Sequence, residues 1–340
     1  MGSEMCIRDS YRIDGEYEDG RHPKSVEFSD RLVDDLCRRD FTINAMAYND
    51  TDGFVDEFKG LDDLDTKIIR CVGEPELRFT EDALRMMRAI RFSAQLGFTI
   101  DEATWNAIKK LSPSISKISM ERVHVELGKT LMSAHPDYVA EYSEAGLFAP
   151  ILPVIDNALK SRYKRKILAT LQHTPDNIYL RYAALFITST PDEAAKTLRA
   201  LKLDNKTVNT VSKLVELSKM DIEETEPAVR TALNKYGRDF LTLWHELMMA
   251  VIQASEDITG ISNPAKVKHL LTLKRLGTDI LARGDCFTIK DLDITGVDLI
   301  EYGLKGAEIG NTLNTLLDIV IENPKLNDKA TLIALLDNLK

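Results

Sequence analysis

The chain has 340 residues, of which 44% are hydrophobic and 29% charged, an ordinary composition for a soluble protein of two or three domains. Its formal net charge of -10 argues against a general nucleic-acid binder, which would carry a broad basic field, but leaves room for one local basic stripe. No apolar run approaches a membrane span and the four cysteines form no C-x-x-C pair, which indicates a reduced, cytoplasmic setting without a zinc site.

The N-terminal part is predicted to mix loops, strands and short helices. Met1–Ser10 does not continue smoothly into the residues after it, and we interpret it as a foreign or misjoined segment outside the fold. Tyr11–Pro23 is polar, contains two glycines and ends in proline, which predicts a mobile loop. A short strand is expected at Ser25–Phe28, and then a helix over Asp30–Arg38 that Ser29 can cap.

A hairpin and a further short strand are predicted next. Asp50–Gly53 turns the chain, and Phe54–Phe58 returns as the second strand of the hairpin. Lys67–Val72 has the composition of another short β segment, and Gly73-Glu74-Pro75 that of a turn.

A helix is predicted over R-F-T-E-D-A-L-R-M-M-R-A-I-R-F-S-A-Q-L-G-F, from Arg78 to Phe98. Thr80 is its expected N-cap and Gly97 its expected stop. Glu81 and Asp82 would then lie in the first turn, where carboxylates suit the positive end of the helix dipole.

Four polar residues of this helix, Asp82, Arg85, Arg88 and Arg91, follow one another at three-residue steps and form a slowly winding stripe. The ordinary interpretation is a solvated face with internal ion pairs, which contribute little to stability. The functional interpretation is that Asp accepts from an exocyclic amine while Arg donates to ring nitrogens and carbonyl oxygens, so the pair reads the edge of a free nucleotide base. Two further arginines could meet phosphates. Spacing alone leaves both interpretations open.

The remainder of the chain is predicted to be helical, without a fixed-period repeat. The sequence therefore predicts an α+β protein, with a small β-containing head followed by an all-α neck, body and tail. The expected helices lie at Asp101–Leu111, from the cap Ser119 to Lys129, and at Arg162–Leu171, Ile178–Thr188, Pro191–Leu201, Asn205–Met220, Glu226–Tyr236, Phe240–Ala254, Ala265–Arg283 and Ile309–Ile321.

Four motifs, in this order and at these gaps, resemble the bacterial class II tRNA nucleotidyltransferases, a family that includes the CCA-adding enzymes and the bacterial poly(A) polymerases. They are R-R-D-F-T-I-N-A-M-A (Arg38–Ala47), F-K-G-L-D-D-L (Phe58–Leu64), V-G-E-P-E-L-R-F-T-E-D-A-L-R-M-M-R-A-I-R-F (Val72–Phe92) and S-M-E-R-V-H-V-E-L-G-K (Ser119–Lys129). The resemblance extends more loosely to D-I-T-G-V-D-L and G-A-E-I-G near the C-terminus.

The resemblance implies an activity and a domain order. It implies CCA addition in the cytoplasm, in which CMP and AMP pass from CTP and ATP to the 3′-hydroxyl of tRNA under an amino-acid template. It implies a partial nucleotidyltransferase head over residues 11–62, a base-selecting helical neck over 63–135, a helical body over 136–222 and a tRNA-binding tail over 223–340. No oligomeric state is indicated.

The resemblance also assigns roles in the head. Arg39 would meet the incoming triphosphate, and Asp40 and Asn44 would organise the ribose and nearby backbone. A plain helix cap is the alternative for Asp40. Tyr11–Pro23 would belong to a flexible loop that helps the base site switch from C to A.

In the neck, Asp82 and Arg85 would form the template that pairs with C or A, and Arg88 and Arg91 would support phosphates and the template. Three more residues would act as structural support. Asp62 would lie at the joint between head and neck, Glu81 in the first turn of the predicted helix, and Arg122 would brace the neck helices rather than contact ligand.

The sequence departs from the family pattern in two places. The family uses two divalent metals, here expected to be Mg²⁺, held by an Asp-x-Asp pair after a Gly-rich segment, and neither precedes Tyr11. We therefore expect this chain to lack metal ligands, to bind nucleotide poorly and to be inactive alone. Phe186-Ile187 stands where some relatives carry a His-Asp dyad, which predicts no phosphohydrolase activity.

Alternatives stay open at this point. Poly(A) polymerases and partial CC- or A-adding enzymes share the motifs. A non-catalytic helical RNA-binding module is another possibility, in which Gly303–Gly306 contacts phosphates of the tRNA elbow or forms an ordinary helix corner. A helical scaffold without nucleic acid would have no need of the R-R-D and E-D-x-x-R segments.

Overall fold

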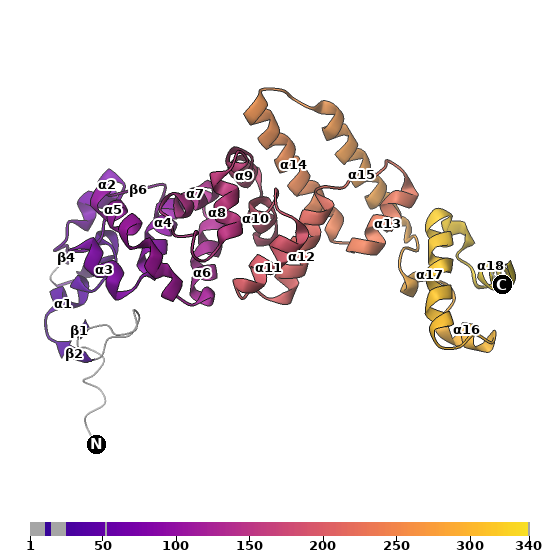
Figure 1. The fold of residues 1–340 in the computed structure, drawn as a ribbon, viewed down its shortest axis with the longest axis horizontal. Coiled ribbons are helices and arrows are strands. Elements are labelled where there is room, and N and C mark those ends of the chain that lie inside the picture. The colour runs from indigo at the N-terminus through magenta and orange to yellow at the C-terminus, as the bar shows by residue number, and fades with distance from the viewer. Residues whose placement is uncertain (1–10, 15–24, 52, 339–340) are drawn as a thin grey trace, which may run out of the picture. The chain divides into compact units, whose positions relative to one another are not determined.

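The structure, a computed structural model, describes residues 11–14, 25–51 and 53–338 (Figure 1). The chain divides into two compact units, Met1–Ser212 and Lys213–Lys340. The described part is a small set of strands followed by helices, so the α+β class with a β-containing head is confirmed. The finer division into head, neck, body and tail stays a prediction. None of the described helices is both long and apolar enough to span a membrane.

The N-terminal strands differ from the expectation. β1 (Tyr11–Asp14) pairs antiparallel with β2 (Val26–Ser29), so the predicted loop is wrong for its first four residues. Residues 15–23 of that loop, and the segment Met1–Ser10, lie outside the described residues. α1 (Leu32–Cys37) follows without a side-chain cap, because Ser29 Oγ donates to Asp34 instead of capping the helix.

The predicted hairpin is confirmed and is shorter than expected. β3 (Ala47–Asn49) pairs antiparallel with β4 (Gly53–Val55). Next along the chain come α2 (Gly60–Thr66) and β5 (Ile68–Ile69), which pairs in parallel with β6 (Thr99–Ile100). A small core lies beneath these elements, built from Leu36, Ala45 and Val72 and partly buried Leu32, Val55 and Phe58.

The single helix predicted from Thr80 is two helices, α3 (Pro75–Glu81) and α4 (Leu84–Leu96). Pro75 starts α3 early, and Thr80 lies inside it, where its hydroxyl donates to the carbonyl of Glu76 at 2.7 Å. Asp82 has extended backbone angles (φ -145°, ψ 104°) and breaks the run. The predicted stop is confirmed, since α4 ends at a left-handed Gly97.

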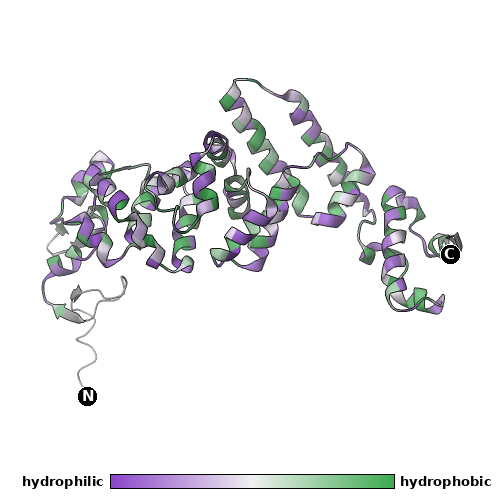
Figure 2. Ribbon diagram, viewed as in Figure 1, coloured by the Kyte–Doolittle hydropathy of each residue, from purple (hydrophilic) through white to green (hydrophobic). Residues whose placement is uncertain are grey.

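The rest of the first unit consists of helices, and Figure 2 shows hydrophobic (green) and hydrophilic (purple) stretches along them. α4 packs on α6, and α3 packs on α5. Buried methionine, alanine and isoleucine side chains of α4 face this interior, together with Val123, Leu127 and Leu131 of α6. The helices are α5 (Glu102–Leu111), α6 (Met120–Leu131), α7 (Val139–Glu144), α8 (Pro153–Lys160), α9 (Lys164–His173), α10 (Ile178–Leu185), α11 (Pro191–Ala200) and α12 (Asn205–Leu217), which crosses into the second unit.

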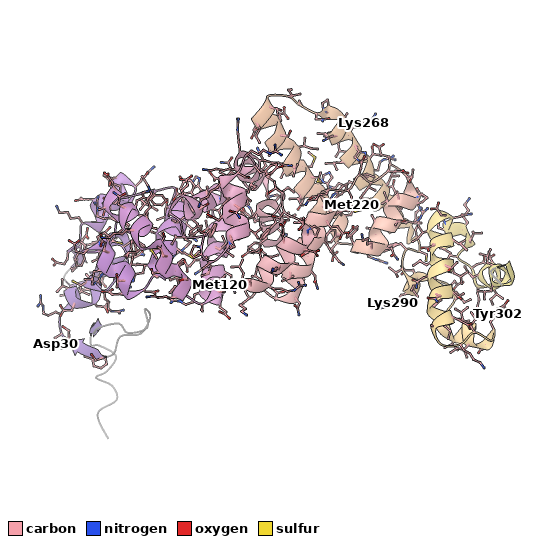
Figure 3. The ribbon with its side chains drawn as sticks, viewed as in Figure 1. Asp30, Met120, Met220, Lys268, Lys290 and Tyr302 are labelled. Atoms are coloured by element: carbon pink, nitrogen blue, oxygen red, sulfur yellow. The ribbon has the colours of Figure 1, made fainter. Side chains whose placement is uncertain are left out.

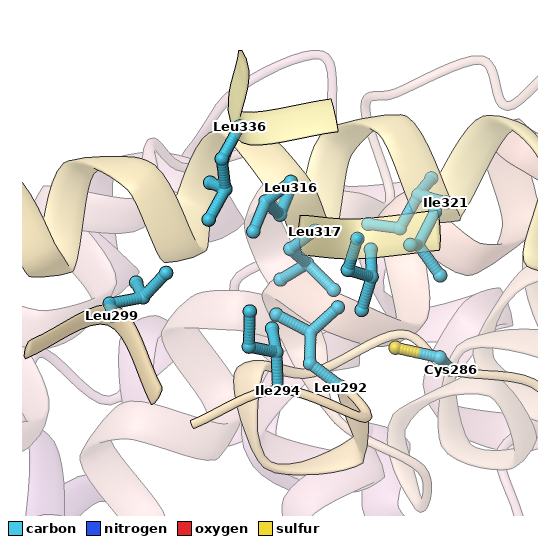
Figure 4. Packing of buried hydrophobic residues seen from close by; sticks show 10 residues of the cluster. Cys286, Leu292, Ile294, Leu299, Leu316, Leu317, Ile321 and Leu336 are labelled. Carbon is cyan, nitrogen blue, oxygen red and sulfur yellow. The ribbon is translucent and has the colours of Figure 1, made fainter. Parts of the chain in front are cut away.

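The second unit is helical throughout its described residues. α15 packs against both α13 and α14, and Arg230 is buried where it donates to the carbonyl of Ile321 and pairs with Asp285 at 2.9 Å. A separate core lies around α17, where Leu316, Leu317 and Ile321 meet Leu292 and Ile294 (Figure 4). The helices are α13 (Glu226–Tyr236), α14 (Phe240–Thr259), α15 (Pro264–Arg283), α16 (Gly296–Glu301), α17 (Ala307–Glu322) and α18 (Lys329–Asn338).

The segment Gly303–Gly306 is the corner between α16 and α17. Both glycines have positive φ, 105° at Gly303 and 58° at Gly306, a conformation that L side chains rarely adopt. These backbone angles explain why glycine occupies both positions, and the explanation requires no bound ligand.

Candidate functional site

A candidate site lies in a cavity of about 490 Å³ in the first unit, between the segment after α1 and the break between α3 and α4. Five arginines surround it, against two aspartates, and this excess of guanidinium groups favours an anionic ligand. The lining residues are Arg38, Arg39, Asp40, Asn44, Asp82, Leu84, Arg85, Arg88 and Arg122.

Asp40 connects the two sides of the cavity. Its side chain is largely buried, and Oδ1 accepts from the backbone N–H of Phe41 at 3.1 Å and from Asn44 Nδ2 at 3.3 Å. Oδ2 accepts from Arg88 Nε at 2.6 Å, across from α4. Asp40 is therefore a cross-link between segments 48 residues apart in the sequence. The alternative, a helix cap, does not apply, because the short helix Thr42–Asn44 has Phe41 at its N-cap and no side-chain cap.

Arg39 presents its guanidinium at the edge of the cavity, with 47% of the side chain exposed. It pairs with Asp35 Oδ2 at 3.1 Å, while Arg38 holds the other oxygen of that carboxylate. Burial acts to raise the pKa of Asp35, but the hydrogen bonds and charges of Arg38 and Arg39 outweigh it and hold the pKa below its usual value. The shared carboxylate fixes where the two guanidinium groups lie.

Asp82 is held at both carboxylate oxygens. Oδ1 accepts from the backbone N–H of Leu84, the first residue of α4, at 3.0 Å, and Oδ2 accepts from Arg122 Nη2 at 2.6 Å. Arg122 comes from the beginning of α6, whose first residue Met120 is labelled in Figure 3. A carboxylate has about four acceptor positions, so these two bonds orient Asp82 and leave it able to accept more.

Arg85 is fixed in the same way. Its Nη1 donates to Glu81 Oε2 at 2.8 Å and to the carbonyl of Arg78 at 3.4 Å, and its Nη2 donates to the carbonyl of Arg38 at 2.9 Å. Arginine has five N–H donors, so Nε–H and one Nη2–H take no part in these bonds. Glu81, predicted as structural support, is the carboxylate that holds Arg85, and it also pairs with Arg78 at 2.6 Å.

Arg91 is not part of the cavity, although the three-residue stripe grouped it with Asp82. It is buried between α4 and α6, where its Nε donates to Glu126 Oε2 at 2.9 Å and its Nη1 to Gln95 at 2.8 Å. Each three-residue step falls about 60° short of a full turn, so the stripe has rotated away from the cavity by the time it reaches Arg91. The expectation that Arg91 meets phosphates has no support in this geometry.

Asp62 lies exposed on α2, and its neighbour Asp63 makes the cross-links. Asp63 is buried, accepts from Thr42 Oγ1 at 2.7 Å and pairs with Arg70 at 3.1 Å; Arg70 in turn pairs with Asp101 ahead of α5. The structure therefore gives Asp62 no cross-linking contact among the described residues, and its role at a joint between head and neck stays a prediction. The L-D-D-L motif contained both carboxylates, and their spacing gave no sign of which one turns inward.

Some residues that line the cavity were not predicted to do so. Arg38 belongs to the R-R-D motif but was assigned no contact, and Leu84 supplies the apolar part of the lining. Arg122 was expected to brace the helices, and it does so through Asp82 while also lining the cavity.

The described residues do not form a metal centre: they contain no group of three or more His, Cys, Asp or Glu side chains placed to hold a metal ion. Within the cavity the carboxylates of Asp40 and Asp82 are each paired with an arginine. Five guanidinium groups around two carboxylates that are already paired with arginine would repel a divalent cation, so this lining does not fit Mg²⁺. It fits the anionic groups of a ligand.

Comparison with known protein families divides the chain into three matched segments. Residues 7–70 match the poly(A) polymerase head domain, and residues 97–159 match the probable RNA and SrmB-binding site of polymerase A. Residues 177–336 match the putative domain 2 of tRNA nucleotidyltransferases. The order of the three segments agrees with the motif order in the sequence.

Whole-chain relatives agree with these segments. The chain is 30% identical to a CCA-adding enzyme of Pediococcus pentosaceus, over all of this chain and 83% of the relative, and 32% identical to one of Lactobacillus helveticus, over 95% and 76%. Among solved structures, the Bacillus stearothermophilus CCA-adding enzyme in complex with CTP aligns with 97% of this chain and 78% of its own, at 28% identity and a TM-score of 0.70. The chain therefore belongs to the family of bacterial CCA-adding enzymes, which are nucleotidyltransferases.

Proposed function

We propose that this protein acts in the addition of CMP and AMP to the 3′ end of tRNA, and that its arginine-rich cavity binds the incoming CTP or ATP. The observation that carries the proposal is that Asp82 and Arg85 lie in one cavity, each held by the protein and each with hydrogen-bonding capacity left over. The related B. stearothermophilus enzyme was solved with CTP, which supports the choice of ligand.

The base would be read by complementarity with its Watson–Crick edge. Cytosine and adenine both place an exocyclic amine next to an unprotonated ring nitrogen, whereas uracil and guanine place a carbonyl next to a ring N–H. A carboxylate at Asp82 accepts from the amine, and Arg85 donates to the ring nitrogen. One such two-point pairing discriminates by about 1–3 kcal/mol, provided that both groups are rigid.

The triphosphate and ribose would occupy the other side of the cavity. Arg39 and Arg88 supply positive charge, and their side chains are 47% and 33% exposed, so they remain accessible to phosphate oxygens. Asp40 and Asn44 would contact the ribose. Arg91, with Glu126, would support the template indirectly by holding α4 on α6.

The proposed partners are tRNA, CTP and ATP, in the cytoplasm where tRNA is processed. Mg²⁺ is the metal that the family resemblance predicts, and no step is assigned to it because the cavity residues do not fit it.

Poly(A) polymerase is the second candidate function. Its nucleotide preference separates it from CCA addition, because a poly(A) polymerase would bind ATP and not CTP.

Equilibrium binding to the full chain tests this proposal. By calorimetry, CTP and ATP should bind more tightly than UTP and GTP, by roughly tenfold or more, in line with the 1–3 kcal/mol of a two-point pairing. Arg85→Ala should remove that preference while tRNA affinity stays nearly unchanged. Arg199→Ala, on the exposed face of α11 and outside the cavity, is the matched control. Equal binding of all four nucleotides by the unaltered protein would refute the template.

A further inference from the structure

A strongly basic surface lies at the corner between α8 and α9, in the segment K-S-R-Y-K-R-K. Five of its seven positions, from Lys160 to Lys166, are Lys or Arg, in a chain whose 54 acidic residues outnumber its 44 basic ones. We call Lys160, Arg162, Tyr163, Lys164, Arg165 and Lys166 the basic corner. Its charge opposes that of the whole protein, so it creates a local positive field.

Part of this charge is not neutralised by the protein. Lys160 pairs with Asp156 at 2.9 Å and Lys164 with Glu144 at 2.6 Å. Arg162, Arg165 and Lys166 are exposed and have no acidic partner among the residues that the structure describes. Three cations are therefore available to an external anion.

The placement of these cations works against the helix that carries them. α9 begins Lys164-Arg165-Lys166, with no acidic residue in its first turn and no side-chain cap. Positive charge at this end opposes the helix dipole, and α11 shows the favourable arrangement, a Thr190 capping box with Asp192 and Glu193 in the first turn. Lys164 gains a pair with Glu144 in return, but Arg165 and Lys166 gain no ion pair among the described residues. Charges that cost stability without such compensation are typical of a functional surface.

Arg162 and Tyr163 contact each other in the basic corner. The Arg162 guanidinium lies 4.9 Å from the centre of the Tyr163 ring, and its Nη2 donates to the tyrosine hydroxyl at 2.9 Å. Tyr163 is 41% exposed. An arginine held against an exposed aromatic ring keeps its remaining donors oriented outward at little cost in side-chain entropy.

We propose that the basic corner binds the phosphate backbone of RNA, in particular of the tRNA required by the proposed function, on which this inference rests. A membrane surface fits less well, because the neighbouring apolar residues Leu159 and Ile167 are buried, so the corner has no apolar face to insert. The contact is electrostatic and reads no base sequence.

The test is the salt dependence of tRNA binding by the full chain. A plot of log K for tRNA binding against the logarithm of the salt concentration has a negative slope, and each lost phosphate contact makes that slope less steep by about 1. The variant R162Q/R165Q/K166Q should therefore reduce the magnitude of the slope by about 2–3. The control K117Q/K196Q/R199Q removes the same charge from exposed positions elsewhere in the first unit and should change the slope by less than about 1. An unchanged slope in the first variant, or an equal change in both, would overturn the proposal.

Two further measurements separate this inference from its alternatives. Thermal unfolding without RNA should show a higher Tm for R165Q/K166Q than for the unaltered chain, because the cations oppose the α9 dipole. A lower Tm together with weaker RNA binding would show that the basic corner acts by stabilising the fold and not by binding RNA.

CTP binding should be unchanged in the triple variant, so a failure of the nucleotide site and a failure of the basic corner are distinguishable. Tighter binding to anionic vesicles than to tRNA would also overturn the assignment.

Discussion

The ion pair between Arg91 and Glu126 is predicted to set the stability of the first unit and the shape of its cavity. Both side chains are buried, 8% and 5% exposed, and they join α4 to α6. The same two helices bring Asp82 to Arg122 at the cavity. Loss of the buried pair is therefore expected to affect both folding and nucleotide binding.

The magnitude depends on the contacts that Arg91 would keep. Removing one partner of a buried ion pair costs about 3–5 kcal/mol, because the other charge stays buried without compensation. In Glu126→Gln, Arg91 keeps its bond to Gln95 and its contact with the Phe92 ring, 3.5 Å from the guanidinium carbon, and a cation–π contact is worth about 0.5–2 kcal/mol. We expect Glu126→Gln to lower the free energy of unfolding by about 2–4 kcal/mol.

Urea unfolding followed by tryptophan fluorescence can isolate this unit. The chain has two tryptophans, Trp105 in α5 of the first unit and Trp244 in α14 of the second. In a Trp244→Phe background the fluorescence therefore reports on the first unit. The same proteins should bind CTP more weakly when Glu126 is Gln.

The control is the double variant Arg91→Met/Glu126→Leu, which replaces the pair with apolar side chains and should lie within about 1–2 kcal/mol of the unaltered unit. A Glu126→Gln variant within about 0.5 kcal/mol of the unaltered unit would refute the reasoning, since surface pairs show effects of that size. If the loss of stability in the double variant equals the sum of the losses in Arg91→Met and in Glu126→Leu measured separately, the two residues act independently.

Two more outcomes are expected in the same unit. Gly60→Ala should destabilise the head by about 1–3 kcal/mol in urea unfolding, because the added Cβ would lie 2.4 Å from the carbonyl oxygen of Thr42; a stability equal to that of the unaltered chain would show that the backbone moves freely there. Burial, followed by the charges of Glu144 and Asp137, raises the pKa of Glu141 to about 7. The folded state then holds a proton that the unfolded state loses near its ordinary value, so stability falls as pH rises from about 4.5 to 7. Glu141→Gln should unfold at higher urea than the unaltered chain at pH 8 and at the same urea at pH 4; a pH-independent difference would contradict the raised pKa.

The sequence predicted the fold class because its helix signals are local. Gly97 ends α4 as expected, since a left-handed residue after an apolar helix is a property of a few neighbouring positions. The hairpin at β3 and β4 was found for the same reason. The predicted helix start at Thr80 was wrong, because Pro75 and Thr80 are both residues that can begin a helix. In the structure the helix begins at Pro75, since proline suits the first helical position.

The sequence by itself determined which residue types could read a base, and the motifs around Asp82 and Arg85 indicated the family. Only the tertiary structure decided which of those residues share a cavity. The family resemblance suggested roles for Arg91 and Asp62, yet Arg91 turns to Glu126 and Asp63 takes the buried position. Arg122 reaches Asp82 from 40 residues away, because α6 packs on α4. Spacing within one helix predicts its faces, but which face meets a cavity depends on the helix that packs against it.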